Sequence, residues 1–330
     1  MDQITETMNQ LEPSKQKFIS SQPMGTGKPT FEVIRKIGRK DLAEVFVARF
    51  RDGRLCEFVD AVDPRYKKEE KWIINLSTQF GCPVGCPYCD AGGGYKGEIK
   101  SHDMLNMAGW VINRNPPDLV ESCRKLKIHF SRMGEPSLND EVLKAIPALR
   151  RHLSNTNVWI CVATVAPRGR DRWFEELLSI KEEFFETRFQ LQFSINSTQA
   201  ETRRHLVPIP HLSLQEIAEY GERFHLKKDR KVALNFALAK GNEFDEKILI
   251  KTFNPDCFCI KLTPVNPTLT GKKNGVETVL RSYRDKKLED SLEHLRHNGF
   301  DVILSIGDAG EDEIGSNCGQ AVRFLSDKIS

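Results

Sequence analysis

Short apolar runs alternate with helix-like stretches over most of the chain, from Trp72 onward. The candidate strands are 72–77, 126–131, 157–163, 189–195, 231–238, 257–263 and 301–306. The candidate helices between them are 102–113, 140–153, 171–184, 213–226, 243–252 and 280–298. Strands that alternate with helices favour a parallel sheet. We therefore predict an α/β fold built on a full or partial (β/α) barrel, with its chemistry at the carboxyl ends of the strands.

The part of the chain before the barrel divides in two. Residues 1–28 are polar and carry Gly and Pro near their end, which predicts a mobile tail. Residues 29–70 contain three β-rich runs, and Asp52-Gly53 is a hairpin turn signal between the last two. We therefore predict a small N-terminal β-rich extension over 29–70, followed by the barrel and a C-terminal segment over 71–330.

Composition excludes several classes of protein. Apolar residues make up 39% of the 330 residues and charged residues 29%, which excludes wholesale disorder. No apolar run reaches the roughly 18 residues of a membrane-spanning helix, and the N-terminus lacks the apolar centre of a secretory signal. We predict a cytoplasmic protein with no membrane partner. The net charge of +3 permits a nucleic-acid partner without requiring one.

Three of the nine cysteines stand close together just past the first barrel strand. Cys82, Cys86 and Cys89 form the spacing C-x₃-C-x₂-C on a loop rich in Gly and Pro, which lets three thiolates converge on one metal centre. Structural zinc takes four protein ligands, and no fourth Cys or His lies nearby. Three thiolates would instead leave one iron of a 4Fe–4S cluster open to a substrate or cofactor. A zinc site, or three buried thiols, is the alternative.

This cysteine pattern, with the aromatic Tyr88 before the last cysteine, resembles that of the radical S-adenosylmethionine (SAM) superfamily. The resemblance implies a partial (β/α)6 barrel, like an incomplete TIM barrel. It also implies two cofactors, a 4Fe–4S cluster and SAM. In this superfamily the open iron chelates SAM, and the reduced cluster cleaves SAM to a 5′-deoxyadenosyl radical. The resemblance therefore implies a reductant such as flavodoxin or ferredoxin as a partner.

Further motifs narrow the resemblance to one branch. They are Met133-Gly134-Glu135-Pro136-Ser137-Leu138-Asn139, Phe193-Ser194-Ile195-Asn196-Ser197, Leu262-Thr263-Pro264-Val265-Asn266-Pro267 and Ser316-Asn317-Cys318-Gly319-Gln320. In order and spacing they resemble the RlmN/Cfr family, which methylates an adenine of RNA, from about residue 70 to residue 322.

The RlmN/Cfr resemblance implies roles for individual residues. Cys318 would be the catalytic residue: a first SAM methylates its thiolate, and a radical formed on that methyl group adds to the adenine. RNA is then the implied partner. The residues that would contact SAM are Tyr88, Gly134, Glu135, Pro136, Thr164, Ser194, Asn196 and Asn266.

Four departures from the family pattern leave the substrate open. The family's second catalytic cysteine, on the first barrel strand, is Asn75 here, and Asn is a poor base that cannot form the releasing disulfide. Asn196 stands where His is usual and Arg132 where Gly is common. From the resemblance we expect the family's helical N-terminal RNA-binding region to be missing or much shortened here. Two alternatives remain: a radical-SAM enzyme acting on a small molecule or peptide, and a zinc-stabilised RNA-binding protein without catalysis.

Other cysteines and basic runs have plainer interpretations. Cys123 and Cys161 lie beside or within apolar strands, which favours core packing. The basic runs 168–172 and 272–273 follow strands and would lie on the carboxyl-end rim, where a polyanion would dock. Each is more often a solvated face. The run 227–231 precedes a strand and should lie on the opposite rim.

Overall fold

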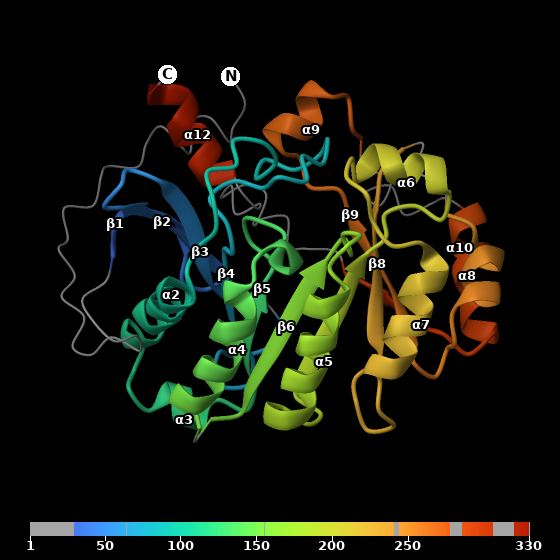
Figure 1. Ribbon diagram of the computed structural model, residues 1–330, viewed down its shortest axis with the longest axis horizontal. Helices are drawn as coiled ribbons and strands as arrows, with labels where there is room; N and C mark the ends of the chain where they lie inside the picture. The colour runs from blue at the N-terminus through green and yellow to red at the C-terminus, as the bar shows by residue number, and fades with distance from the viewer. Residues whose placement is uncertain are drawn as a thin grey trace.

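The computed structural model describes residues 30–63, 65–154, 156–240, 244–277, 286–305 and 320–329. Ten strands form one sheet in chain order (Figure 1). They are β1 (Phe31–Arg39), β2 (Ala43–Phe50), β3 (Leu55–Val62), β4 (Trp72–Leu76), β5 (Leu126–Phe130), β6 (Val158–Thr164), β7 (Phe189–Ser194), β8 (Val232–Leu238), β9 (Phe258–Pro264) and β10 (Asp301–Leu304). The helices are α2 (Ser101–Asn113), α3 (Leu119–Ser122), the 3₁₀ turn η1 (Pro136–Leu138), α4 (Glu141–His152), α5 (Asp171–Phe184), α6 (Ala200–Leu206), α7 (Leu214–Phe224), α8 (Glu246–Thr252), α9 (Leu269–Lys273), α10 (Lys286–His297) and α12 (Gln320–Ile329).

The strands from β4 to β10 are parallel, and each is hydrogen-bonded to the next along the chain. Strands β1 to β3 form an antiparallel meander, and β3 pairs antiparallel with β4. The β-rich run at 29–62 therefore continues the barrel sheet directly. The prediction of an α/β fold with a partial barrel is confirmed.

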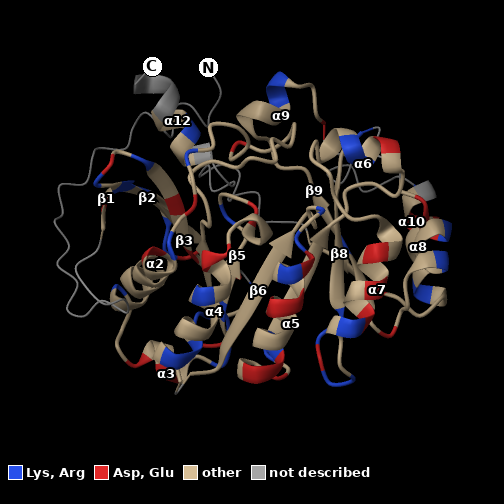
Figure 2. Cartoon of the chain, in the orientation of Figure 1, with Lys and Arg blue, Asp and Glu red and all other residues tan. Residues whose placement is uncertain are grey.

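Side chains alternate between the two faces of the parallel strands. On the outer face, Trp72, Ile74 and Leu76 of β4 are fully buried. Helices α2, α4, α5 and α7 lie over this outer face (Figure 1). The outer surfaces of these helices carry acidic and basic residues interspersed, as α5 shows (Figure 2). The apolar side chains whose alternation predicts the strands thus form the surface of the sheet that contacts the helices.

The inner face of the same strands is polar. Lys127 and His129 of β5 alternate with buried Ile128, and Gln190 and Gln192 of β7 alternate with Leu191. Barrel interiors are usually filled by branched apolar side chains. The interior of this barrel therefore differs in chemistry from an ordinary packed core.

Several features differ from the sequence prediction. The helix predicted over 243–252 begins at Glu246, because the side chain of Asp245 accepts a hydrogen bond from the amide of Lys247 and caps it. Of the helix predicted over 280–298, the structure describes Lys286–His297. The predicted tail 1–28 and Cys318 lie outside the described residues. No helix in the described part of the chain is long and apolar enough to cross a bilayer.

Helix α12, at the C-terminal end of the described chain, packs against the antiparallel meander. Its residues Ala321, Phe324 and Leu325 pack against the apolar cluster that Ile37 and Val45 form on the meander. This contact brings the C-terminal helix to the N-terminal strands, near the carboxyl ends of the first barrel strands (Figure 1).

Candidate metal and cofactor site

The loop after β4 folds back on itself and carries the three clustered cysteines. The amide of Gly93 donates to the carbonyl of Cys82 at 3.1 Å, and the amide of Cys89 donates to the carbonyl of Cys86 at 3.1 Å. Gly81 has φ +76°, and a Cβ there would lie 2.6 Å from the carbonyl oxygen of Gly94. Only glycine fits this crossing of the loop. The sequence thus brings Cys82, Cys86 and Cys89 together at the carboxyl edge of the sheet.

The three thiols are partly buried, and burial is the main influence on the pKa of Cys82 and of Cys86. Burial raises the pKa of Cys82 to about 12. Burial, followed by the nearby Cys89 and Cys82, raises the pKa of Cys86 well above its ordinary value. A bound cation reverses this preference, because metal-coordinated thiols lose their protons. The thiol set therefore suits a positively charged centre.

The spacing of these thiols bears on which metal centre they fit. No three His, Cys, Asp or Glu side chains among the described residues close around a single metal ion. In a 4Fe–4S cluster each thiolate binds a different iron atom, so the ligands stand farther apart than around one ion. In donor type, three cysteine thiols on one loop match the ligands of a 4Fe–4S cluster.

Tyr88 and Asn196 meet beside the cysteine loop. The side-chain amide of Asn196 donates to the Tyr88 hydroxyl at 2.6 Å, and its oxygen accepts from the amide of Ala237 at 3.2 Å. Asn196 has φ +65°, a left-handed conformation that Asn tolerates better than most residues. Burial, and after it Cys86, raises the pKa of Tyr88. Asn196 therefore ties the cysteine loop to the end of β8.

Glu135 and Thr164 also meet, at the ends of β5 and β6. One carboxylate oxygen of Glu135 accepts hydrogen bonds from Ser137 and from Thr164, and the other accepts from the amide of Val165 at 2.9 Å. Burial raises the pKa of Glu135, and these hydrogen bonds oppose the shift. Gly134, at φ +101°, passes so close to Gln79 that a Cβ would lie 2.7 Å from its side chain. The loop before Pro136 is thus packed against the base of the cysteine loop.

Two other predicted SAM contacts lie apart from these pairs. Ser194 ends β7 opposite Asn235 of β8, and Asn266 is exposed on the loop after β9. In the part of the chain that the structure covers, neither side chain hydrogen-bonds to the other predicted site residues. The Oδ1 atom of Asn235 is buried without a hydrogen-bond partner. Asn235 is therefore a polar group at this edge that the sequence did not single out.

Asp90, which directly follows Cys89, is a further site residue that the sequence reading missed. Its carboxylate accepts hydrogen bonds from the backbone amides of Leu269 at 3.0 Å and Thr270 at 2.8 Å. The Thr268 hydroxyl donates to the carbonyl of Tyr88 at 2.7 Å. The first turn of α9 is therefore fastened to the cysteine loop. Its position directly after the last cysteine of the loop is the sequence feature that could have indicated Asp90.

The departures at Asn75 and Arg132 have structural partners. The Ser131 hydroxyl donates to the side-chain oxygen of Asn75 at 3.2 Å inside the barrel. Arg132 forms an ion pair with Glu57 of β3 at 2.7 Å. Cys123 and Cys161 are buried, as expected, although Cys161 also lines the barrel interior.

Comparison with known proteins shows which proteins the chain is similar to. No family model matches it. It is 28% identical over 282 residues, 83% of this chain and 78% of the relative, to a Pseudothermotoga lettingae protein named "Probable dual-specificity RNA methyltransferase RlmN". A Desulfitobacterium hafniense protein of the same name is 25% identical, over 88% of this chain and 79% of the relative. The chain is therefore similar, over most of its length, to proteins that are named RlmN.

A solved structure agrees with this placement at the level of the fold. The crystal structure of a radical SAM methyltransferase from Sphaerobacter thermophilus superposes with a TM-score of 0.66 at 20% identity. The match covers 88% of this chain and 81% of the other chain. The RlmN-like resemblance and the partial-barrel fold predicted from the sequence are both confirmed.

Proposed function

We propose that the chain is a radical-SAM enzyme in which Cys82, Cys86 and Cys89 hold a 4Fe–4S cluster. The observation that carries the proposal is the gathering of three thiols on one tightly folded loop at the carboxyl edge of a partial barrel. When bound and reduced by a donor such as flavodoxin or ferredoxin, the cluster supplies the electron that cleaves SAM to a 5′-deoxyadenosyl radical.

The strand ends around the loop supply groups suited to SAM. The Glu135 oxygen that accepts from Val165 takes no other hydrogen bond within the described residues, so it has capacity left for an ammonium group. A cation there would also favour the charged form of this buried carboxyl group. We assign Gly134, Pro136 and Thr164 to holding Glu135 in place. We assign Tyr88, Ser194, Asn196 and Asn266 to the surrounding walls.

The first candidate reaction is methyl transfer to an sp² carbon of adenine in RNA. The names of the relatives state RNA methylation as their activity. In this reaction Cys318 would carry the methyl group. The reaction needs Cys318 close to the Cys82–Cys89 loop.

A second candidate is radical chemistry on a small molecule without RNA methylation. The observation that favours it is Asn75, whose side-chain oxygen accepts from Ser131 in the place where the family carries its releasing cysteine. An amide neither removes a proton as a base nor forms a disulfide. The RNA adduct would then lack its release step.

Iron and sulfide analysis of protein purified without air tests the cluster. We expect a brown protein whose iron is lost in Cys86→Ala and kept in the control Cys257→Ala, because Cys257 lies outside the loop. Colourless protein, or zinc in place of iron, would overturn the proposal.

Incubation with labelled SAM and a reductant separates the two candidate reactions. The RNA candidate requires label in RNA, a methyl group on Cys318 by intact mass, and loss of both in Cys318→Ala. Formation of 5′-deoxyadenosine with no labelled RNA, unchanged by Cys318→Ala, would support the second candidate instead.

A further inference from the structure

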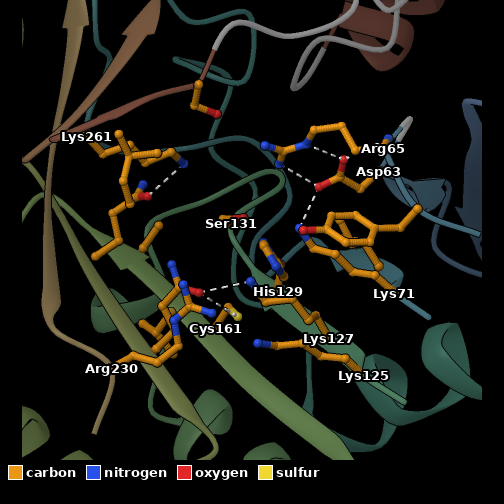
Figure 3. A pocket seen from close by; sticks show the side chains of 18 of the residues that line it. Asp63, Arg65, Lys71, Lys125, Lys127, His129, Ser131, Cys161, Arg230 and Lys261 are labelled. Carbon is orange, nitrogen blue, oxygen red and sulfur yellow. Dashed lines mark hydrogen bonds and ion pairs between the residues drawn. The ribbon is translucent and has the colours of Figure 1, made fainter. Parts of the chain in front are cut away.

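A cavity of about 580 Å³ occupies the interior of the partial barrel, on the side away from the covering helices (Figure 3). It runs the length of the strands, from Lys125, which precedes β5, to Ser131, which follows it. Small side chains leave the space open, among them Cys161 and Ala163 of β6. A cavity of this size is typical of sites for small ligands.

The wall of this cavity is strongly basic. Lysine and arginine contribute six of the lining side chains, and carboxylates contribute two. Of the carboxylates, Asp63 is already paired with Arg65 at 2.9 Å and with Lys71, and Glu70 accepts from the amide of Lys67. No carboxylate among the described residues forms an ion pair with the four remaining cations. These are Lys125, Lys127, Arg230 and Lys261.

Two of these lysines line the cavity from different strands, Lys127 from β5 and Lys261 from β9. The ammonium group of Lys127, which is 7% exposed, donates to Gln190 at 2.9 Å, and that of Lys261 donates to Gln192 at 3.1 Å. Each ammonium group has three protons to donate, and the partners are neutral: Gln190 and the Cys161 thiol for Lys127, and Gln192 for Lys261. A buried charge is costly unless it is paired. Lys127 and Lys261 therefore each lack an anionic partner among the described residues.

His129 lines the same cavity from β5, two residues after Lys127 (Figure 3). Its Nε2 atom is buried and has no hydrogen-bond partner. Burial, followed by Lys127 and Lys261, lowers the pKa of His129 well below its ordinary value, so the ring is neutral. A neutral ring with an unsatisfied nitrogen facing the cavity is a second, independent group that lacks a partner.

We propose that the barrel interior binds a small anionic ligand whose phosphate or carboxylate group is held by Lys127 and Lys261, with His129 as a third contact. The assignment of this ligand as the substrate of the radical chemistry rests on the proposed function. The binding of an anion in the cavity does not depend on that function. A neutral adenine base would leave both lysines without an anionic partner.

Isothermal titration without SAM or reductant tests the site. The probes are inorganic phosphate, pyrophosphate and citrate, with chloride as background, added to the full-length protein. Saturable binding of phosphate and pyrophosphate would indicate a ligand with a phosphate group. Saturable binding of citrate would indicate a ligand with a carboxylate group. Each lost ammonium contact should weaken binding about tenfold.

The variants are Lys127→Met and Lys261→Met, with Lys144→Met as an exposed lysine control. Methionine keeps the length of the side chain, and thermal unfolding will show that each variant is folded. Unchanged affinity in both cavity variants, or no saturable binding of any probe, would overturn the proposal. RNA that competes with phosphate in a manner dependent on Lys127 would overturn the small-ligand assignment. Failure of SAM cleavage alone would leave the anion site standing.

Discussion

The guanidinium group of Arg132 lies 2.7 Å from the carboxylate of Glu57, and both side chains are buried. The pair joins the loop that leads into Gly134 to strand β3 of the meander. The Ser77 hydroxyl donates to the carbonyl of Glu57 and accepts from the amide of Met133, so it links the same two segments. The unusual arginine is thus matched by a glutamate on the strand that extends the barrel.

Arg132→Ala should lower the free energy of unfolding by about 3–5 kcal/mol, because it removes the cation that pairs with the buried Glu57 carboxylate. Chemical denaturation measures this. The control Arg223→Ala removes an exposed ion pair with Glu175 and should cost about 1 kcal/mol or less. Equal losses in the two variants would contradict a structural role for the buried pair.

Tyr88→Phe removes the hydroxyl group that accepts from Asn196. The buried amide then lacks its acceptor, and we expect a loss of about 1–3 kcal/mol in unfolding free energy. The cysteines stay in place, so the iron content of protein purified without air should match that of the wild type. Loss of iron with unchanged stability would show that the tyrosine acts on the metal centre instead.

Asp90→Ala removes the acceptor for the first two amides of α9. Loss of a capping carboxylate costs about 0.5–2 kcal/mol. We expect faster proteolytic cleavage in 268–274 while the remaining barrel stays protected. Asp256→Ala, at an exposed turn, serves as the control. Unchanged cleavage would mean that α9 is held by other contacts.

Lys125 should be more reactive than Lys144 toward acetic anhydride near neutral pH. Burial, and then Arg230 and Lys127, lowers its pKa from 10.5 to about 8. The neutral amine is the nucleophile, so labelling should rise steeply from pH 7 to 9. Lys144, whose pKa the partner Glu141 raises, should stay largely unlabelled over this range. Site-resolved mass spectrometry measures both, and equal rates would contradict the shift.

The sequence predicts the barrel strands because their outer residues alternate with period two, and the cysteine loop because its spacing is local. Contacts between distant segments leave no such signal. Arg132 finds Glu57, and Asp90 finds α9, only once the sheet has formed. The polar interior did leave a trace, since Lys127 and His129 alternate with apolar residues within one strand, yet a strand pattern alone does not tell which face meets a cavity.

Other predictions stay open for physical reasons. The limits of the N-terminal extension are blurred, because β3 pairs directly with β4 in one continuous sheet. Cys318 lies outside the described residues, so its role as a methyl carrier stays a proposal. The basic run 168–172 is partly engaged, since Arg168 pairs with Glu216 at 2.7 Å and Arg170 pairs with Asp140.

The fastening of α9 to the cysteine loop has a consequence for how the proposed cluster would be loaded. Amides and hydroxyls from 268–274 already fix the backbone around Cys89 through the carbonyl groups of Pro87 and Tyr88 and the carboxylate of Asp90. The proposed cluster would then enter a loop that is already folded, so that folding would not depend on the cluster. A chelator should bleach the protein while its circular dichroism stays unchanged, and iron and sulfide added later should restore the colour.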